Sequence, residues 1–458
     1  MDPDLIRSKR WPPVARKEDK GKQMRGSVAS YPIFPAPGAV LGRPLPLSTL
    51  RITKGTITDL AWILFIIGAG SAARPLGVQN VERYFWLAAD LIVVLFLLHD
   101  YRPLLTMSLK NKLLMTWPAI ATLSALWSYN PGISLYQGLQ LFMTTMVGFL
   151  FCSQIDRKRI PRILFLGLLV CLLSSVAFKF VNPREAYDGN GAFQGVFTHK
   201  NVLGSMMTLL IFTSTCLFFA HWRPLLTLTA AAAAAIVLVM TKSGTALIMA
   251  VLTLMPIMLA FLVRRGPRTL SAGVGAIIVI SVLACTVIVF AQIDVFGLAL
   301  ASVGKDATLT GRTILWGFGA DAFLEHPWLG FGYKGYWEST QSTVFYLRYV
   351  IGQDLWFFHN NFIEMAVAFG FMGPVLLIAG ILQGYGRTLR VFLRDHDYIS
   401  LWYVLFMVCV TIDSFVEYPL FLNHGLYQFL FVAVVASSGA ALSDRKRTRR
   451  HQGGRNDV

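Results

Sequence analysis

The chain has 458 residues, of which 55% are hydrophobic and only 14% are charged, and its formal net charge is +17. A soluble protein carries about a quarter charged residues, so this composition excludes an ordinary soluble enzyme and predicts a protein that lies largely in a membrane. The positive charge does not indicate nucleic-acid binding, because 17 of the 41 Lys and Arg residues lie in the two polar tails and most others in short loops.

The two ends of the chain differ in composition from the part between them. Residues 1–56 are polar, basic and proline-bearing, and no apolar segment occurs before residue 57. This composition predicts a disordered cytoplasmic tail and argues against a cleavable signal peptide. Residues 57–442 are predicted to form a polytopic membrane domain, and residues 443–458 a second basic cytoplasmic tail.

Apolar segments of similar length fill the central part of the chain. A helix that crosses the bilayer core needs about 20 mostly apolar residues. Twelve segments come close to this length: 57–73, 83–99, 113–129, 133–152, 162–181, 202–220, 225–241, 244–263, 272–291, 361–383, 398–413 and 425–442. The sequence therefore predicts an all-α integral membrane protein with about 12 transmembrane helices.

The distribution of Lys and Arg predicts how these helices are oriented. If the N-terminus lies inside, the short internal loops hold 13 Lys and Arg residues and the short external loops hold 4. Internal loops of membrane proteins carry the excess of positive charge. We therefore expect a multi-pass protein of the bacterial inner membrane with both termini in the cytoplasm.

One predicted extracytoplasmic segment, 292–360, is much longer than the other loops. It is rich in tryptophan and other aromatic residues, and loops of this length are usually functional or disordered. Thr310 is predicted to cap a short helix from about 311 to 325. Its apolar residues fall on one face, so the helix is expected to lie at the outer membrane–water boundary. These residues are Ile314, Leu315, Phe318, Ala322 and Phe323.

Polar residues gather at the predicted outer ends of the helices. Charged groups close to the hydrocarbon are costly, so they indicate function, although each one alone is also explained as an interfacial anchor. Several cations at one aqueous rim suit a substrate that carries a diphosphate. The residues are Arg184, His199, Lys200, Asn201, Lys242, Arg312, His359, Asn360 and Glu364.

Two histidines in this set, His199 and His359, each stand at the head of an apolar segment. A neutral imidazole is a suitable base for a hydroxyl group at neutral pH, but position alone leaves an interfacial anchor equally open.

The Asp395-His396-Asp397 stretch is predicted to be internal. The sequence contains no Walker loop, no GxSxG motif and no clustered Cys and His ligands, so we expect no cofactor and no metal.

Four stretches resemble a known family when they are taken in order. The first is Leu126-Trp127-Ser128, followed by Pro131 and Ser134-Leu135, and the second is the segment GVFTHKNVLG at 195–204. The third is TLTGRTILW at 308–316, continued by HPWLGFGY at 326–333, and the fourth is His359-Asn360 with Gly370 and Gly373. Together with the long external loop, they resemble the O-antigen ligase and Wzy-type polymerase superfamily, especially exopolysaccharide polymerases of the rhizobial kind. The resemblance covers most of residues 120–440.

The resemblance implies a metal-independent membrane glycosyltransferase. Its donor is an oligosaccharide repeat unit on a polyprenyl diphosphate such as undecaprenyl diphosphate, and its acceptor is a hydroxyl of a growing polysaccharide at the extracytoplasmic face. On this basis Arg312 neutralises the departing diphosphate and His359 takes the acceptor proton, while the glycines at 311, 330 and 332 let a sugar chain approach the backbone. The residues expected to bind substrate are His199, Lys200, Asn201, Asn360, Arg184, Lys242, Trp316 and Glu364. A chain-length regulator and export proteins are expected partners besides the lipid bilayer.

Two departures from the family pattern bear on the alternatives. Relatives often carry Ser-Arg after the seventh span, where this chain has Lys242-Ser243-Gly244. Ligases tend to have threonine where this chain has Gly373, which favours a polymerase. The alternative within the family is a ligase that moves a finished glycan to a lipid A core or a protein. The alternative of another class is a transporter or flippase of the same lipid-linked sugar, which the gathering of charges at one rim disfavours.

Overall fold

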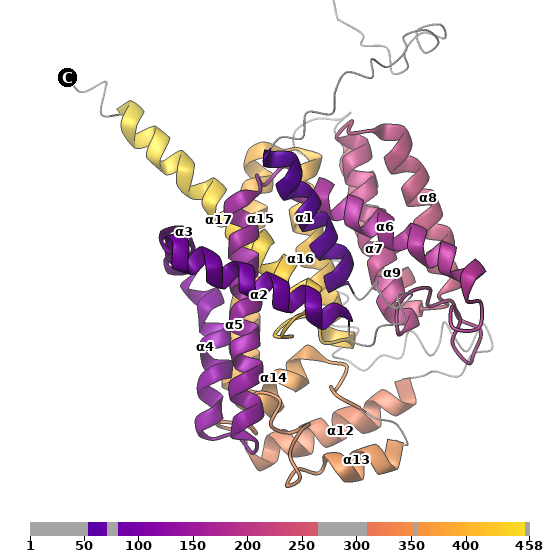
Figure 1. Cartoon of the computed structure of the whole chain (residues 1–458), viewed down its shortest axis with the longest axis vertical. Coiled ribbons are helices and arrows are strands. Elements are labelled where there is room, and N and C mark those ends of the chain that lie inside the picture. Colours follow the sequence, from indigo (N-terminus) through magenta and orange to yellow (C-terminus); the bar gives the residue numbers. More distant parts are fainter. Residues whose placement is uncertain (1–53, 71–80, 264–308, 352–354, 454–458) are drawn as a thin grey trace, which may run out of the picture. The chain divides into compact units, whose positions relative to one another are not determined.

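The structure, a computed structural model, describes residues 54–70, 81–263, 309–351 and 355–453, and its regular elements in these ranges are helices (Figure 1). Six of these helices are long and apolar enough to cross a membrane, and a bent pair is a seventh candidate if it forms one broken span. The six are α5 (Pro131–Gln154), α6 (Ile160–Val181), α7 (Lys200–Phe219), α9 (Gly244–Val263), α16 (Tyr398–Val416) and α17 (Leu426–Gly453). The prediction of an all-α, multi-pass membrane protein is thus confirmed, whereas the number of about 12 spans stays a prediction.

Most of the remaining predicted segments coincide with helices that are shorter or less apolar. The bent pair consists of α2 (Val81–Asp100) and α3 (Arg102–Lys110), which meet at 105°. The others are α1 (Lys54–Ala69), α4 (Lys112–Leu123) with the short 3-10 helix η2 (Ser124–Leu126), and α8 (Pro224–Met240). The predicted span 272–291 and most of the tail 1–56 lie outside the described residues, and α17 continues through part of the predicted tail 443–458.

The predicted span 361–383 is wrong as a single helix. It is divided into α14 (Asn361–Phe369) and α15 (Met372–Asp395) by Gly370, whose φ of +62° favours glycine. A Cβ atom at Gly370 would lie 2.3 Å from the carbonyl oxygen of Pro327, and the amide of Phe371 donates to the same oxygen at 2.8 Å. The break is therefore imposed by the close approach of the segment that follows α12.

The predicted internal loop 384–397 is also wrong over most of its length, because α15 runs to Asp395. Most of its charged residues lie on α15, and several of them are paired with neighbouring elements. Arg387, for example, donates to Asn111 between α3 and α4 and to the carbonyl of Val435 in α17. Charges that suggest a solvated loop in the sequence instead join helices.

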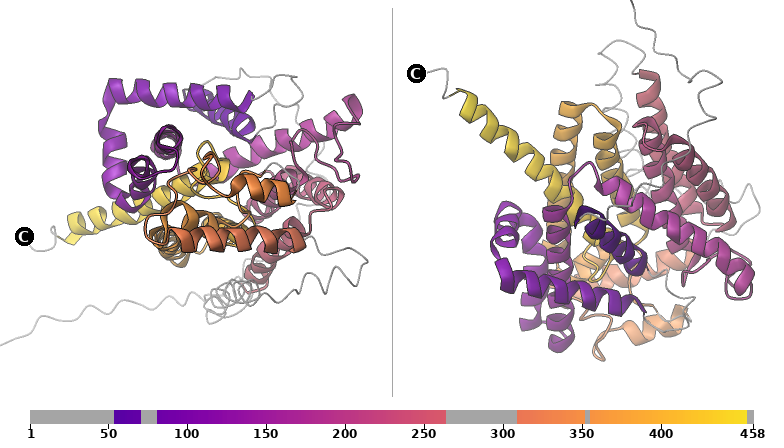
Figure 2. Two further views of the ribbon diagram at one scale, coloured as in Figure 1. Left: turned by 90° about the horizontal axis from the view of Figure 1, so that it is seen from below. Right: turned by 45° about the horizontal axis from the view of Figure 1, so that its top comes forward.

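Helix α16 packs against α7, α9, α14, α15 and α17, and most of its residues are buried (Figures 1 and 2). It begins at a capping box, in which Asp397 accepts from the amide of Ser400 at 2.7 Å. The helix ends before Glu417, which has an extended backbone. The middle of α16 is enclosed by other helices, and polar residues stand at its two ends, Asp397 before it and Glu417 after it.

The predicted helix in the long loop is present as α12 (Leu309–Glu325), which packs on α14 and on α13 (Val344–Ile351). It starts one residue before Thr310, so Thr310 lies in the first turn and is not the predicted cap. Leu315 and Ala322 are buried as expected, but Ile314 is 47% exposed. The apolar face is thus rotated away from Ile314.

The segment after α12, residues 326–333, is hydrogen-bonded to residues of the first and fourth motif stretches. The amide of Phe331 donates to Val367 in α14 at 2.9 Å, and its carbonyl accepts from Tyr129 at 3.1 Å. Gly330 and Gly332 have φ of +65° and +84°, and a Cβ atom at Gly330 would lie 2.4 Å from the carbonyl oxygen of Val367. Gly330 therefore admits the backbone of α14 and Gly332 admits Ser128, at positions where the sequence suggested the approach of a sugar chain.

Candidate active site

The carboxylate of Glu417, directly after α16, joins the two residues predicted to be catalytic. Its Oε2 atom lies 2.8 Å from Nδ1 of His359, and its Oε1 atom accepts from Nη2 of Arg312 at 3.3 Å. Because an ionised carboxylate only accepts hydrogen bonds, Nδ1 of His359 carries the proton in this contact. The three side chains are between 20% and 26% exposed, so each of them is partly accessible to solvent.

His359 stands just before α14 and is held there by its neighbour. Asn360 caps the helix, since its Oδ1 accepts from the amides of Phe362 and Ile363, and its Nδ2 donates to the carbonyl of Phe415 at 3.2 Å. The polar atoms of Asn360 thus fasten the start of α14 to the end of α16. The helix starts after His359, whose φ is +49°.

The start of α7 reaches the same carboxylate. His199 is the N-cap of α7, and its Nδ1 accepts from the amide of Asn201 at 3.2 Å. The amide group of Asn201 donates to Oε1 of Glu417 at 3.4 Å and accepts from the hydroxyl of Ser243 at 3.2 Å. Residues from the second, third and fourth motif stretches therefore meet around Glu417.

Two lysines extend the cluster along the loop that precedes α7. Lys200 forms an ion pair with Asp188 at 3.2 Å, and Lys242 donates to the carbonyl of Asn190 at 3.3 Å. Arg184 of the same loop is exposed and forms no ion pair within the described part of the chain. Lys200 and Lys242 thus both contact the loop around residues 188–190. Arg184 of this loop forms no ion pair with either carboxylate of the cluster within the described residues.

Trp316 and Glu364, which the sequence suggested as substrate contacts, both bond to Phe358. The indole of Trp316 donates to the carbonyl of Phe358 at 3.0 Å, and Oε2 of Glu364 accepts from its amide at 3.1 Å. The other carboxylate oxygen of Glu364 accepts from the indole of Trp337 at 2.9 Å. Both side chains therefore contact the backbone that precedes His359.

The surroundings of the cluster shift the pKa values of Glu417 and His199. Partial burial raises the pKa of Glu417, but the hydrogen bond from His359 and the positive charge of Arg312 outweigh it, so the pKa is lowered. The ring of His199 is exposed, yet the surrounding residues exclude part of its water, and this partial desolvation lowers its pKa although Glu417 opposes the effect. At neutral pH Glu417 is thus charged and His199 neutral.

The arrangement places a histidine beside a group of positively charged side chains. Nδ1 of His359 is occupied by Glu417, which leaves Nε2 as the atom that can take a proton, the pattern in which a carboxylate orients a catalytic imidazole. Lys200, Lys242 and Arg312 supply three fixed positive charges, against the two carboxylates of Asp188 and Glu417 that pair with them. The site can therefore attract an anion while it deprotonates a neutral group.

Sequence reasoning missed Glu417, although a signal for it exists. Acidic residues are scarce in this chain, 24 against 41 basic ones, and Glu417 directly follows an apolar segment on the predicted outer side. A charged carboxylate close to the hydrocarbon costs free energy, so an acidic residue at such a helix end indicates a function. Among the described residues, no group of three or more His, Cys, Asp or Glu side chains could hold a metal ion, and metal independence of the reaction stays a prediction.

Comparisons with known proteins agree with the motifs. Residues 229–378, which include Lys242, Arg312 and His359, match the family described as O-Antigen ligase. The exopolysaccharide production protein ExoQ of Rhizobium meliloti is 28% identical to the chain over 386 residues, which are 82% of this chain and 86% of ExoQ. These findings confirm the resemblance inferred from the four stretches, and the chain is thus similar to the O-antigen ligase and Wzy-type polymerase superfamily.

Proposed function

We propose that the protein polymerises an exopolysaccharide by transferring oligosaccharide repeat units from a polyprenyl diphosphate to an acceptor hydroxyl. The observation that carries this proposal is the shared carboxylate of Glu417, which bonds both a histidine and an arginine. A histidine oriented by a carboxylate suits a hydroxyl acceptor, and a group of cations suits a diphosphate leaving group. The similarity to ExoQ and to O-antigen ligases supports the same class of reaction.

In the proposed reaction the acceptor oxygen attacks the anomeric carbon of the donor sugar. The bond between this carbon and the diphosphate oxygen breaks, and the electron pair leaves with the diphosphate. The acceptor proton passes to Nε2 of His359, while Glu417 stabilises the imidazolium that forms. The charge that develops on the diphosphate is neutralised by Arg312, with Lys200 and Lys242 as further cations.

We also propose that this site faces the outside of the bacterial inner membrane. The support is the asymmetry of 13 against 4 Lys and Arg residues in the short loops. Alkaline phosphatase folds only outside the cytoplasm, so its fusion after Gly330 should be active and its fusion after Arg265 inactive. Reversed activities would refute the orientation and with it the access of an external acceptor.

Deletion of the gene tests the reaction itself. A polymerase is supported if polymer is lost while single repeat units accumulate on the carrier lipid at the outer leaflet. Complete chains that remain on the lipid would instead identify a ligase. Single repeat units confined to the cytoplasmic leaflet would identify a transporter. The length of the glycans is read by extracting the carrier lipid and sizing them, and the leaflet is read by whether an impermeant oxidant such as periodate modifies the sugars in intact spheroplasts.

A further inference from the structure

A second pair of opposite charges contacts the residues next to His359 and Glu417. Nζ of Lys334 is 3.7 Å from Oε1 of Glu364, and the two side chains are only 12% and 4% exposed. Charges removed from water are costly, and a hydrophobic pair of similar size often stabilises a fold as well or better. The position of this pair therefore calls for a reason other than stability.

The acidic member of the pair holds the backbone that carries His359. Glu364 accepts from the amide of Phe358, while Trp316 donates to the carbonyl of Phe358, so both polar groups of this residue are fixed. His359 itself has a φ of +49°, which a residue with a side chain seldom adopts unless its surroundings impose it. Glu364 is thus one of the contacts that keep His359 in this conformation.

The basic member of the pair reaches the segment that carries Glu417. Nζ of Lys334 lies 4.5 Å from the ring centroid of Tyr418, the residue after Glu417, in a cation–π contact. Tyr418 is further held by its hydroxyl, which donates to the carbonyl of Phe421 at 2.8 Å. Lys334 therefore touches the neighbour of Glu417, just as Glu364 touches the neighbour of His359.

We propose that Lys334 and Glu364 are a positioning pair, which sets the distance between His359 and Glu417 by clamping Phe358 and Tyr418 together. The inference rests on the function proposed above and deepens it, because it names the residues that orient the base. Neither member of the pair contacts the imidazole of His359 or the carboxylate of Glu417 directly within the described hydrogen-bonded network. A catalytic base displaced by about 1 Å can lose about 10²-fold in rate.

The test uses the full-length protein, purified and reconstituted in liposomes with a lipid-linked oligosaccharide donor. Lys334→Met should lower kcat by about 10- to 100-fold while KM for the donor changes little. Lys334→Arg keeps the charge and the contact with Tyr418, so it should restore most of kcat. The double variant Lys334→Met/Glu364→Gln leaves no unpaired buried charge, and the new amide side chain retains an acceptor for Phe358, so it should fold even if the single variant does not. It should still show a reduced kcat.

The matched control is the ion pair between Arg157 and Asp395, 2.7 Å apart near the other end of α16. The double variant Arg157→Met/Asp395→Asn should lower the amount of folded protein but leave kcat per molecule unchanged. If the Lys334 variants behaved in the same way, with normal kcat per folded molecule, the pair would be merely structural and the inference overturned.

A structure of the Lys334→Met/Glu364→Gln variant separates this inference from the proposed function. We expect the distance between Nδ1 of His359 and Oε2 of Glu417 to exceed hydrogen-bonding range, from 2.8 Å in the wild type. If the distance widened in a protein whose wild type makes no polymer, the pair would be confirmed and the function refuted. If the distance and kcat were both unchanged in an active protein, the pair would be refuted and the function would stand.

Discussion

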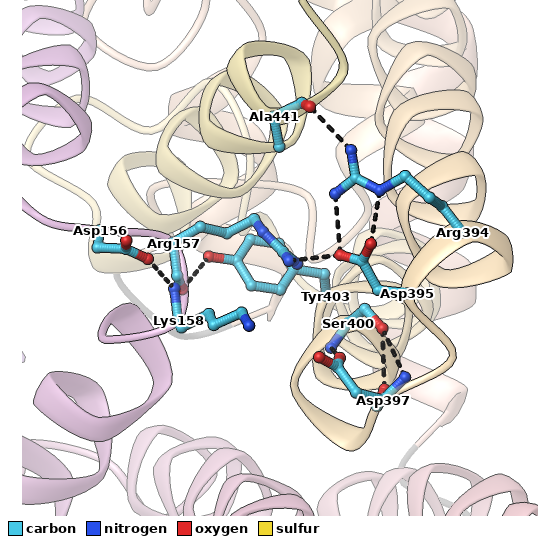
Figure 3. A network of polar contacts seen from close by, with 9 residues as sticks. All are labelled: Asp156, Arg157, Lys158, Arg394, Asp395, Asp397, Ser400, Tyr403 and Ala441. Carbon is cyan, nitrogen blue, oxygen red and sulfur yellow. Dashed lines mark hydrogen bonds and ion pairs between the residues drawn. The ribbon is translucent and has the colours of Figure 1, made fainter. Parts of the chain in front are cut away.

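The two ends of α16 each carry a cluster of charged residues, and the clusters use their charges differently. At the start of the helix Arg394 binds Asp395 through two nitrogens, and Arg157 binds the same carboxylate at 2.7 Å (Figure 3). Arg394 also donates to the carbonyl of Ala441 in α17, and the hydroxyl of Tyr403 in α16 donates to the carbonyl of Arg157. Each charge here connects one helix or turn with another.

At the end of α16 the single carboxylate of Glu417 is divided between Arg312 and His359. Neither Arg312 nor His359 reaches a backbone carbonyl of a neighbouring helix within the described hydrogen bonds, whereas Arg394 does at the opposite end. The second cluster also includes Lys200 and Lys242 near the same loop. The charges at the start of α16 thus connect neighbouring helices, whereas those at its end are shared around the partly exposed carboxylate of Glu417.

The comparison predicts the largest loss of activity for His359. His359→Ala should leave the protein folded and inserted but abolish polymer, because removal of a general base costs about 10²- to 10⁴-fold. His359→Asn is the sharper variant, since asparagine tolerates the positive φ of +49° at this position. Polymer and lipid-linked repeat units would be measured together, and the repeat units should accumulate.

The control for this loss is His221→Asn, because His221 is exposed, has a φ of +57° and lies in the turn between α7 and α8. It should make normal polymer. His359 variants that are present at normal abundance and make chains of normal length and amount would refute the role of His359 as base.

The next largest loss is expected at Arg312. Arg312→Lys should impair activity nearly as much as Arg312→Ala, because a guanidinium can bind a diphosphate through two hydrogen bonds, whereas an ammonium acts as a point charge. Loss of such a contact to the transition state costs roughly 3 kcal/mol, or about 100-fold. The measurement is the initial rate with purified donor.

Arg348→Lys is the matched control for Arg312, since Arg348 lies on α13 and its guanidinium donates to the carbonyl of Leu355. This change should alter the rate little. An Arg312→Lys protein that retained its polymer would show that Arg312 only anchors the start of α12.

The residues that could and could not be read from the sequence differ in a physical way. His359 and Arg312 each stand in a short local pattern next to an apolar segment, and such a pattern can be recognised without a structure. Their partner Glu417 lies 105 residues from Arg312 and 58 from His359, and only the packing of α12, α14 and α16 brings them together. Pairing at such separations is not encoded in any local pattern.

The helices show the same limit. Long apolar segments such as α6 and α7 can be predicted within a few residues, since a membrane helix needs little beyond length and apolarity. The break at Gly370 could not be predicted because its cause is the contact with Pro327, which belongs to a distant segment. The extension of α15 to Asp395 could not be predicted because its charges are neutralised by other residues that only the fold brings near.

A smaller loss of activity is expected for Glu417→Gln. Glutamine retains the size and one acceptor, but a hydrogen bond to a neutral group is weaker by about 1.4 kcal/mol, which is a tenfold effect on rate. KM for the donor should not rise, because Arg312 loses its competing carboxylate. Glu338→Gln, at an exposed position between α12 and α13, is the control. A Glu417→Gln protein with wild-type kcat would contradict the orienting role of this carboxylate.

The smallest expected effect concerns the dependence of stability on pH. The pKa of His199 is lowered from 6.5 in the folded protein, so the unfolded chain binds more protons at this site and stability falls as the pH drops below about 6.5. The pKa of Glu417 is lowered from 4.5, so its contribution is present above pH 4.5 and is lost only as the pH falls through the folded value.

Thermal unfolding in detergent at pH 7.5 and at about pH 5.5 distinguishes the two groups, because the pKa of an unfolded histidine lies within that interval and that of an unfolded glutamate lies below it. His199→Gln should lose less stability over the interval than the wild type does. Since the ring is exposed, we expect a difference in Tm of at most about 2 °C. Glu417→Gln should lose at least as much stability as the wild type in this interval, because the charge of Glu417 opposes the lowering of the His199 pKa. A greater loss in His199→Gln than in the wild type would mean that protonation of His199 stabilises the folded protein, which would contradict a lowered pKa at this position.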